Sequence, residues 1–255
     1  MPLILRTIPC LSDNYAFLIH DPETQATAVV DAPEAPPILD ALALEGWTLT
    51  DIFLTHHHWD HIDGAPDLIA ATGAKVTGAK ADAHRLPKLD RAISDGDSFA
   101  FGGETVQIID VSGHTLGHIA FHLPGSLLVF TADSLMAMGC GRLFEGKPEV
   151  MWASLSKLAA LAPETTVCSG HEYTEANLKF AESLDADDPK LQARAAQIRA
   201  KRAANKPTVP SLLSDELATN PFLRVTDPAY KRTLGKPDAS DVACFAHVRA
   251  LKDQF

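Results

Sequence analysis

The stretch Thr55-His56-His57-His58-Trp59-Asp60-His61 brings several potential metal ligands together within a few positions. It follows an apolar run that is typical of a buried strand, and it leads into a segment with helical spacing. Because side chains alternate along an extended chain, we expect His56, His58 and Asp60 to point to one side, with His61 following as the chain turns. Imidazoles and a carboxylate that converge at a strand end suit a borderline-soft divalent metal.

Three further potential ligands each stand just after an apolar run that predicts a strand. A single histidine in such a place is usually structural, but the neighbouring cluster favours metal binding. The full set of five histidines and two aspartates suits two metal ions that share Asp133. We expect His57 to face away from the ions and His118 to pack in the core near them. The candidate ligands are His56, His58, Asp60, His61, His114, Asp133 and His171.

Apolar periodicity divides the chain into a strand-rich body and a helical tail. In the body it predicts strands over residues 3–8, 15–20, 27–31, 51–55, 105–111, 119–123, 127–131 and 165–168, and helices over 34–45, 63–72 and 151–161. In the tail it predicts helices over residues 174–184, 189–205, 211–219 and 241–254, with prolines between them. We therefore expect two domains, residues 1–172 and residues 173–255.

Composition and charge exclude several classes of protein. Of the 255 residues, 46% are apolar, which is enough for a sizeable core, but no apolar run approaches the ~18 residues of a membrane span. The net charge of −11 argues against a nucleic-acid partner. Residues 1–172 carry 9 Lys/Arg against 22 Asp/Glu, whereas residues 173–255 carry 13 against 11, so an anionic ligand would favour the tail. With no secretory signal in view, we expect a cytoplasmic monomer with reduced cysteines.

The metal motif resembles the metallo-β-lactamase superfamily. Its T-H-x-H-x-D-H pattern appears here as residues 55–61, and the segments Gly113-His114-Thr115, Ala132-Asp133 and Gly170-His171 match the later ligands. The resemblance implies an α/β fold, the metallo-β-lactamase αββα sandwich, with the metals at one edge of two sheets and a C-terminal helical domain after it. That superfamily hosts several reactions, so the fold alone does not fix the substrate.

Other segments resemble glyoxalase II, the hydroxyacylglutathione hydrolase family. They are residues 139–146, whose glycines suit a flexible loop, and residues 170–174, 220–224 and 249–255. The resemblance implies hydrolysis of S-D-lactoylglutathione and related S-2-hydroxyacylglutathione thioesters to glutathione and a 2-hydroxy acid. That reaction is the second step of methylglyoxal detoxification.

The same resemblance assigns residues to the glutathione thioester. By position, Arg142 and Tyr173 contact the peptide, while Arg249 and Lys252 hold the glycyl carboxylate. Phe144 stands where some members of the family have Tyr, so one hydroxyl contact is absent here. Independently, Arg249 and Lys252 are three positions apart on a predicted helix and so share a face, where they can attract an anion to an acidic body.

The chemistry follows from the expected metals. Two divalent ions, zinc with iron or manganese as alternatives, lower the pKa of a shared water so that hydroxide exists near neutrality. We expect Asp133 to span the ions, and Asp60 to complete the second site and orient the hydroxide, which makes both catalytic. The leaving thiolate departs without a strong general acid, because the pKa of a thiol is only about 8.5.

Three alternatives compete with this interpretation. A β-lactamase would normally be exported. A persulfide dioxygenase of the same fold uses a single iron ion and would not need the second ligand set. A non-enzymatic, metal-dependent binding protein would hold structural ions, but structural zinc sites are usually closed by four ligands, often cysteines.

Overall fold

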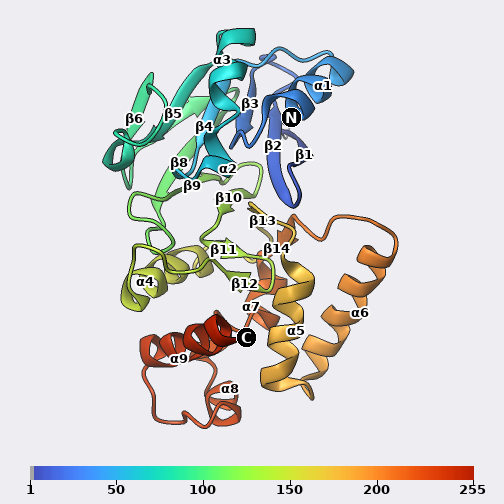
Figure 1. The fold of residues 1–255 in the computed structure, drawn as a ribbon, viewed down its shortest axis with the longest axis vertical. Helices are drawn as coiled ribbons and strands as arrows, with labels where there is room; N and C mark the ends of the chain where they lie inside the picture. The colour runs from blue at the N-terminus through green and yellow to red at the C-terminus, as the bar shows by residue number, and fades with distance from the viewer. Residues whose placement is uncertain (1–2) are drawn as a thin grey trace.

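Two six-stranded sheets packed face to face form the centre of the computed structural model, which describes residues 3–255 (Figure 1). The first sheet contains, in spatial order, β1 (Ile4–Cys10), β2 (Asn14–His20), β3 (Thr27–Val30), β4 (Asp51–Leu54), β5 (Lys75–Ala79) and β6 (Arg91–Ile93). The second contains β14 (Ser211–Leu212), β13 (Thr166–Ser169), β10 (Leu128–Ala132), β9 (Ile119–Leu123), β8 (Glu104–Asp110) and β7 (Ser98–Phe101). A small hairpin, β11 (Leu135–Met136) and β12 (Gly139–Cys140), follows β10.

Phenylalanines from both sheets fill the space between them. The rings of Phe53 and Phe121 stack with centroids 5.1 Å apart, and those of Phe17 and Phe130 meet at 5.7 Å. All four side chains are buried, because alternate residues of each strand face the opposite sheet. This aromatic core fixes the two sheets relative to each other and therefore fixes the edge at which the ligand-bearing loops meet.

Helices cover the outer face of each sheet. The first sheet carries α1 (Ala35–Glu45) and α3 (Ala65–Thr72), whose apolar sides pack on it, and the second carries α4 (Pro148–Ala159). The expected αββα sandwich is therefore confirmed (Figure 1). Three short helical turns, α2 (Trp59–Ile62), η1 (Lys80–Asp82) and η2 (Arg224–Thr226), lie in the connections between longer elements.

The C-terminal helices extend the layer that α4 begins. They are α5 (Thr174–Asp185), α6 (Pro189–Ala203), α7 (Leu213–Thr219), α8 (Pro228–Thr233) and α9 (Asp241–Gln254). α9 lies against α4, and its Phe245 and Val248 join the buried cluster that contains Leu155. None of the helices within residues 3–255 combines the length and apolar character that crossing a bilayer requires.

The structure departs from the predicted elements mainly where they are short. β5, β6, β7 and α8 were not predicted, and the sequence of β5, Lys-Val-Thr-Gly-Ala, holds a single large apolar side chain. The predicted helix over residues 211–219 is wrong at its start, because Ser211 and Leu212 form β14 beside β13. Residues 211–212 thus belong to the sheet of the body, although the domain boundary after residue 172 stays a prediction.

Candidate metal centre and substrate cavity

The metal motif changes conformation in its middle. The chain stays extended through His58, which precedes the first turn of α2, and Asp60 lies in that turn. The prediction that Asp60 shares a side with His56 and His58 is therefore wrong. The helical turn carries Asp60 to His171, with its Oδ2 atom 3.5 Å from His171 Nε2.

One group of ligands comes from the ends of β4, β8 and β10. His58 Nδ1 lies 3.1 Å from His56 Nε2 and 3.0 Å from His114 Nε2. Asp133 Oδ2 lies 3.4 Å from His114 Nε2. One ligand atom from each of the four side chains lies within 4.8 Å of the other three, which is the spacing of ligands around a single ion.

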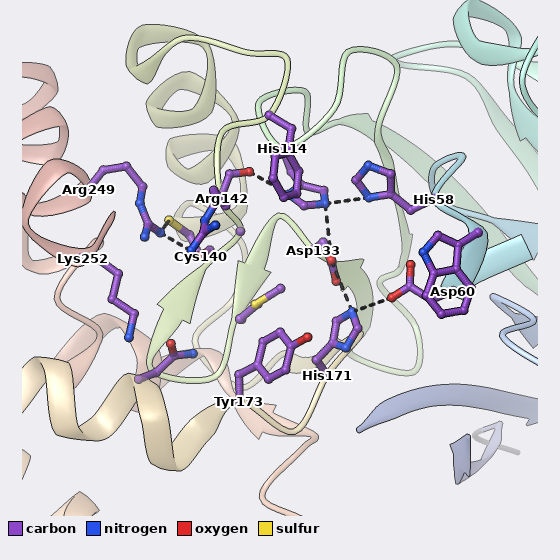
Figure 2. Close-up of a pocket in the computed structure, with 15 residues that line it drawn as sticks. His58, Asp60, His114, Asp133, Cys140, Arg142, His171, Tyr173, Arg249 and Lys252 are labelled. Carbon is purple, nitrogen blue, oxygen red and sulfur yellow. Dashed lines mark hydrogen bonds and ion pairs between the residues drawn. The ribbon is translucent and has the colours of Figure 1, made fainter. Parts of the chain in front are cut away.

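A second group lies on the other side of Asp133. It consists of Asp60, His61 and His171, whose ligand atoms also lie within 4.8 Å of one another. Asp133 Oδ2 is 3.4 Å from His171 Nε2, and Asp133 Oδ1 is 3.5 Å from His61 Nε2. Figure 2 shows Asp133 between His114 and His171, so one carboxylate faces both groups.

Outer hydrogen bonds hold these histidines in the form that binds metal. Nδ1 of His61 donates to Asp31 Oδ2 at 2.7 Å, and Nδ1 of His171 donates to Asp13 Oδ1 at 2.8 Å. Nδ1 of His114 donates in the same way to the Arg142 carbonyl, at 2.7 Å. Because each of these acceptors fixes a proton on Nδ1, each ring turns its Nε2 to the centre, where a bound ion would take the place of any second proton.

The centre has the surplus of acceptors that cations require. Nε2 of His61 and Nε2 of His171 are 3.3 Å apart, so either a proton or a metal cation must lie between the two nitrogen atoms. Asp133 Oδ1 is buried and accepts no hydrogen bond from the described residues. Buried polar atoms normally have partners, and divalent ions are the partners that this donor set suits. The buried His/Asp clusters thus fit a dinuclear metal site.

Burial keeps the histidines of the first group neutral. It lowers the pKa of His58 to about 4, and it lowers the pKa of His56 and His114 as well, so these rings are neutral near pH 7.

Burial alone would raise the pKa of Asp133. The neighbouring His61 and His171 outweigh that effect and hold the pKa of Asp133 below its usual range, so it is a carboxylate. Burial would lower the pKa of His61, but Asp133 and Asp31 outweigh burial and raise it to about 9, and Asp133 likewise raises the pKa of His171. Without an ion these two rings hold a second proton near pH 7, which a bound ion would displace.

The ligands open into a cavity of about 490 Å³. At one end lie His58 and Asp60, and across the cavity lie Arg249 and Lys252, as Figure 2 shows. The cavity is lined by His58, Trp59, Asp60, His114, Asp133, Met136, Cys140, Gly141, Arg142, Phe144, His171, Tyr173, Asn177, Arg249 and Lys252. An acidic metal centre and a cationic end thus share one cavity.

Comparison with known proteins identifies the family. Residues 14–171 match the model of the metallo-beta-lactamase superfamily, and residues 172–255 match that of the hydroxyacylglutathione hydrolase C-terminus. Over 255 residues, the full length of both chains, this chain is 60% identical to the hydroxyacylglutathione hydrolase of Ruegeria pomeroyi. The chain belongs to the hydroxyacylglutathione hydrolase family. A relative of the same name from a Jannaschia species is also 60% identical and covers 98% of this chain and 97% of its own.

Solved structures at lower sequence identity share the fold. ETHE1 from Myxococcus xanthus superposes with a TM-score of 0.68 at 24% identity, over 97% of this chain and 90% of its own. TTHA1623, solved in a di-iron-bound form, gives a TM-score of 0.62 at 25% identity, over 86% of this chain and 100% of its own. The likeness to ETHE1 concerns the fold alone.

All five residues predicted to bind the hydroxyacylglutathione substrate line the cavity. The Tyr173 ring stacks on His171 with centroids 4.6 Å apart. Lys252 Nζ donates to the Ala176 carbonyl at 3.2 Å and lies over two aromatic rings. Arg249 is only 5% exposed; its Nη1 donates to the Cys140 carbonyl at 3.2 Å, and its Nη2 lies 2.8 Å from an Asp253 carboxylate oxygen. Arg249 therefore already has partners within the chain.

The glycines of the loop that this family carries at residues 139–146 allow close approach. A Cβ atom on Gly141 would lie 1.9 Å from the Asp133 carbonyl oxygen, and one on Gly146 would lie 2.5 Å from the Gly113 carbonyl oxygen. These two glycines therefore allow close packing, and the flexibility of the loop stays a prediction. At Gly141 and Gly146 the loop backbone packs in direct contact with the segments that carry Asp133 and His114.

Sequence reasoning missed the residues that orient the ligands. Asp31 follows β3 and Asp13 lies in the β1–β2 turn, far in sequence from the histidines that they contact. Asp31 has a φ of +57°, a conformation that few residues other than glycine adopt. This unusual φ marks Asp31 as a special position, but it can be seen only in the structure and not in the sequence. The expected core position of His118 is confirmed: its ring stacks on His56 with centroids 4.5 Å apart.

Proposed function

We propose that this chain hydrolyses S-D-lactoylglutathione and related S-2-hydroxyacylglutathione thioesters to glutathione and a 2-hydroxy acid. The observation that carries the proposal is the single cavity that joins the ligand groups around Asp133 to a cationic end at Arg249 and Lys252. A glutathione thioester has a reactive carbonyl, which suits the metal end of the cavity, and remote carboxylates, which suit its cationic end. The 60% identity to proteins named for this reaction supports the same substrate class.

The two ligand groups would hold two divalent ions, with Asp133 shared between them. When bound, the ions supply hydroxide near neutral pH and a Lewis acid that stabilises the charge developing on the thioester oxygen. Zinc is our first choice, with iron and manganese as alternatives, because all three accept histidine and aspartate ligands. The di-iron form of TTHA1623 supports a site of this nuclearity on the fold.

Asp60 is the proposed group that orients the attacking oxygen. It lines the cavity, and Asn14 Nδ2 holds it by donating to Asp60 Oδ2 at 3.1 Å and to its carbonyl at 2.9 Å. A carboxylate fixed in this way can accept a proton from the nucleophile without changing rotamer. Asp133 remains ionised throughout, because the histidines around it stabilise its negative charge.

The glutathione part of the substrate would occupy the far end of the cavity. Lys252 has ammonium hydrogens left beyond its bond to Ala176, so it is placed to bind the glycyl carboxylate directly. Arg249 adds its charge from a buried position, while Arg142, with a side chain 64% exposed, and Tyr173 would contact the peptide. Phe144 would pack on the apolar part of the substrate near the thioester.

The assay that tests the proposal is release of thiol from S-D-lactoylglutathione, run beside metal analysis of the same protein. We expect about two ions per chain, loss of turnover on chelation and recovery when zinc or manganese is added. His58→Ala should lose most of kcat, whereas His84→Ala, which changes an exposed histidine outside the cavity, should not.

The following results would overturn the proposal. One is a folded, metal-loaded protein that releases no thiol from any 2-hydroxyacyl glutathione. Another is a single bound iron ion with oxygen consumed on glutathione persulfide, which would favour the dioxygenase alternative. Ions bound with no reaction on either substrate would favour a binding protein.

A further inference from the structure

Glu145 anchors the loop that carries Phe144. Both Nη atoms of Arg85 donate to its carboxylate, and the Leu116 backbone N–H donates to Glu145 Oε2 at 2.6 Å. Arg85 lies 60 residues earlier in the chain, so these bonds tie the loop to a distant part of the body. Bidentate arginine–carboxylate pairs are the strongest and most directional ion pairs available to side chains.

The same arginine reaches back to the metal motif. Arg85 Nε donates to Asp82 Oδ1 at 2.5 Å, and His57 Nδ1 lies 2.9 Å from Asp82 Oδ2. The Asp82 side chain is fully buried, and burying a carboxylate is costly unless charged or hydrogen-bonding partners surround it. We call the series His57, Asp82, Arg85 and Glu145 the Glu145 clamp; it begins inside the histidine motif and ends in the loop.

The clamp acts on residues 141–146, which we call the substrate loop. Backbone N–H groups of Phe144 and Glu145 donate to the His114 carbonyl at 3.2 and 3.3 Å. The Phe144 ring lies 5.2 Å from the His114 ring and 5.7 Å from the His58 ring, centroid to centroid. Phe144 is nevertheless 61% exposed, so its own packing holds it only weakly. The position of its ring depends on the residue next to it, Glu145.

We propose that Arg85 and Glu145 are positioning residues for substrate binding, which rests on the function proposed above. They hold the substrate loop so that Phe144 covers the metal-binding histidines and contacts the bound thioester. Neither residue lines the cavity, so neither touches the substrate itself. His57 thereby has a role without binding metal: its ring supports the buried Asp82 that orients Arg85.

The test compares Glu145→Ala, Glu145→Gln and Arg85→Ala with the wild type. Arg199→Ala is the matched control. Arg199 lies on the surface of α6, where it forms an ion pair with Glu182 of α5 away from the cavity. We expect Glu145→Ala and Arg85→Ala to raise KM for S-D-lactoylglutathione about 10-fold with kcat within twofold, a change equal to about 1.4 kcal/mol. Metal content should stay unchanged, because no ligand is altered.

Further measurements separate positioning from stability. Glu145→Gln keeps an oxygen for Leu116 and Arg85, so it should recover most of the binding that Glu145→Ala loses. Affinity for S-hexylglutathione, measured by calorimetry, should fall in parallel with the rise in KM, whereas Arg199→Ala should bind it normally. Thermal unfolding of each variant shows whether the chain is folded under the assay conditions.

The outcomes are distinct from those of the proposed function. If the wild type releases no thiol, the function fails. If the wild type is active but Glu145→Ala and Arg85→Ala keep wild-type KM and S-hexylglutathione affinity, the positioning role is wrong. It is also wrong if kcat and metal content fall with KM unchanged, or if only the melting temperature falls, since both patterns describe structural support alone.

Discussion

Replacing Lys252 and Arg249 separately should divide substrate binding from structural support. Both were expected to hold one carboxylate, but their surroundings differ. Lys252 Nζ has a single backbone acceptor at 3.2 Å, whereas the buried Arg249 guanidinium is bonded to Cys140 and Asp253 and lies 5.1 Å from the Phe222 ring centroid. Lys252→Ala should therefore affect mainly the ligand, and Arg249→Ala should affect the ligand and the fold.

The expected magnitudes follow from those contacts. A charge-assisted hydrogen bond contributes about 1.5–3 kcal/mol, and the partial exposure of Lys252 puts it at the low end, so Lys252→Ala should raise KM about 10-fold with little change in kcat. Arg249→Ala removes a buried donor from the Cys140 carbonyl, a loss of about 2 kcal/mol that lowers Tm by about 4–8 °C. Lys252→Ala should leave Tm within a degree or so of the wild type.

The assay is steady-state thiol release with thermal unfolding of the same samples, and Lys201→Ala on the exposed end of α6 is the control. Burial lowers the pKa of Lys252, so its charge is present below that pKa and is lost as pH rises through it. Wild-type KM should then rise at an alkaline pH where an ordinary lysine is still charged, and Lys252→Ala should lack that rise. The reasoning is refuted if Lys252→Ala keeps wild-type KM, or if it lowers kcat alone.

Three other changes test the surrounding structure. Asp31→Ala removes the acceptor that orients His61, so metal affinity measured by chelator competition should fall about 10- to 100-fold while the fold is retained; unchanged affinity would contradict its orienting role. Truncation before Asp241 deletes α9 with its buried Phe245 and Val248, which lowers the free energy of unfolding by more than about 3 kcal/mol. The truncated chain should show no cooperative melting by circular dichroism, and a normal melting curve would mean that α9 is dispensable for folding. Arg85 holds the pKa of Glu145 at about 2, below the ordinary 4.5, so this pair stabilises the fold fully above pH 4.5 and less as pH falls toward 2; Glu145→Gln should flatten that part of the stability–pH curve.

The clustering of the candidate ligands could be predicted from sequence, because strand ends are easy to recognise and the histidine motif is dense. His114, Asp133 and His171 each follow an apolar strand, and strands that pair in one sheet bring their ends together. The sequence did not predict that Asp60 and His56 belong to different ligand groups. This separation depends on the single helical turn of α2, whereas the chain from residue 56 to residue 60 was predicted to be extended.

The supporting residues were harder to predict for a physical reason. Asp31, Asp82 and Arg85 act through contacts with residues at least 24 positions away or through a short 3-10 turn, and charged residues in loops are usually solvated. The roles of the two aspartates become visible from their burial: Asp31 is 3% exposed and Asp82 is 0% exposed. A single sequence does not distinguish such carboxylates from the many acidic residues on its surface.

The two-residue strand β14 has a consequence for synthesis of the chain. β14 pairs with β13, the strand that leads to His171. Just before β14, Thr208 donates hydrogen bonds from its backbone N–H and its hydroxyl to Glu172, the residue after His171. A ribosome adds His171 to the chain before residues 208–212, so this candidate ligand is made before its neighbours in the sheet. We expect the nascent metal centre to close only after those residues emerge, so loading of the ions would wait for about the last fifth of the chain.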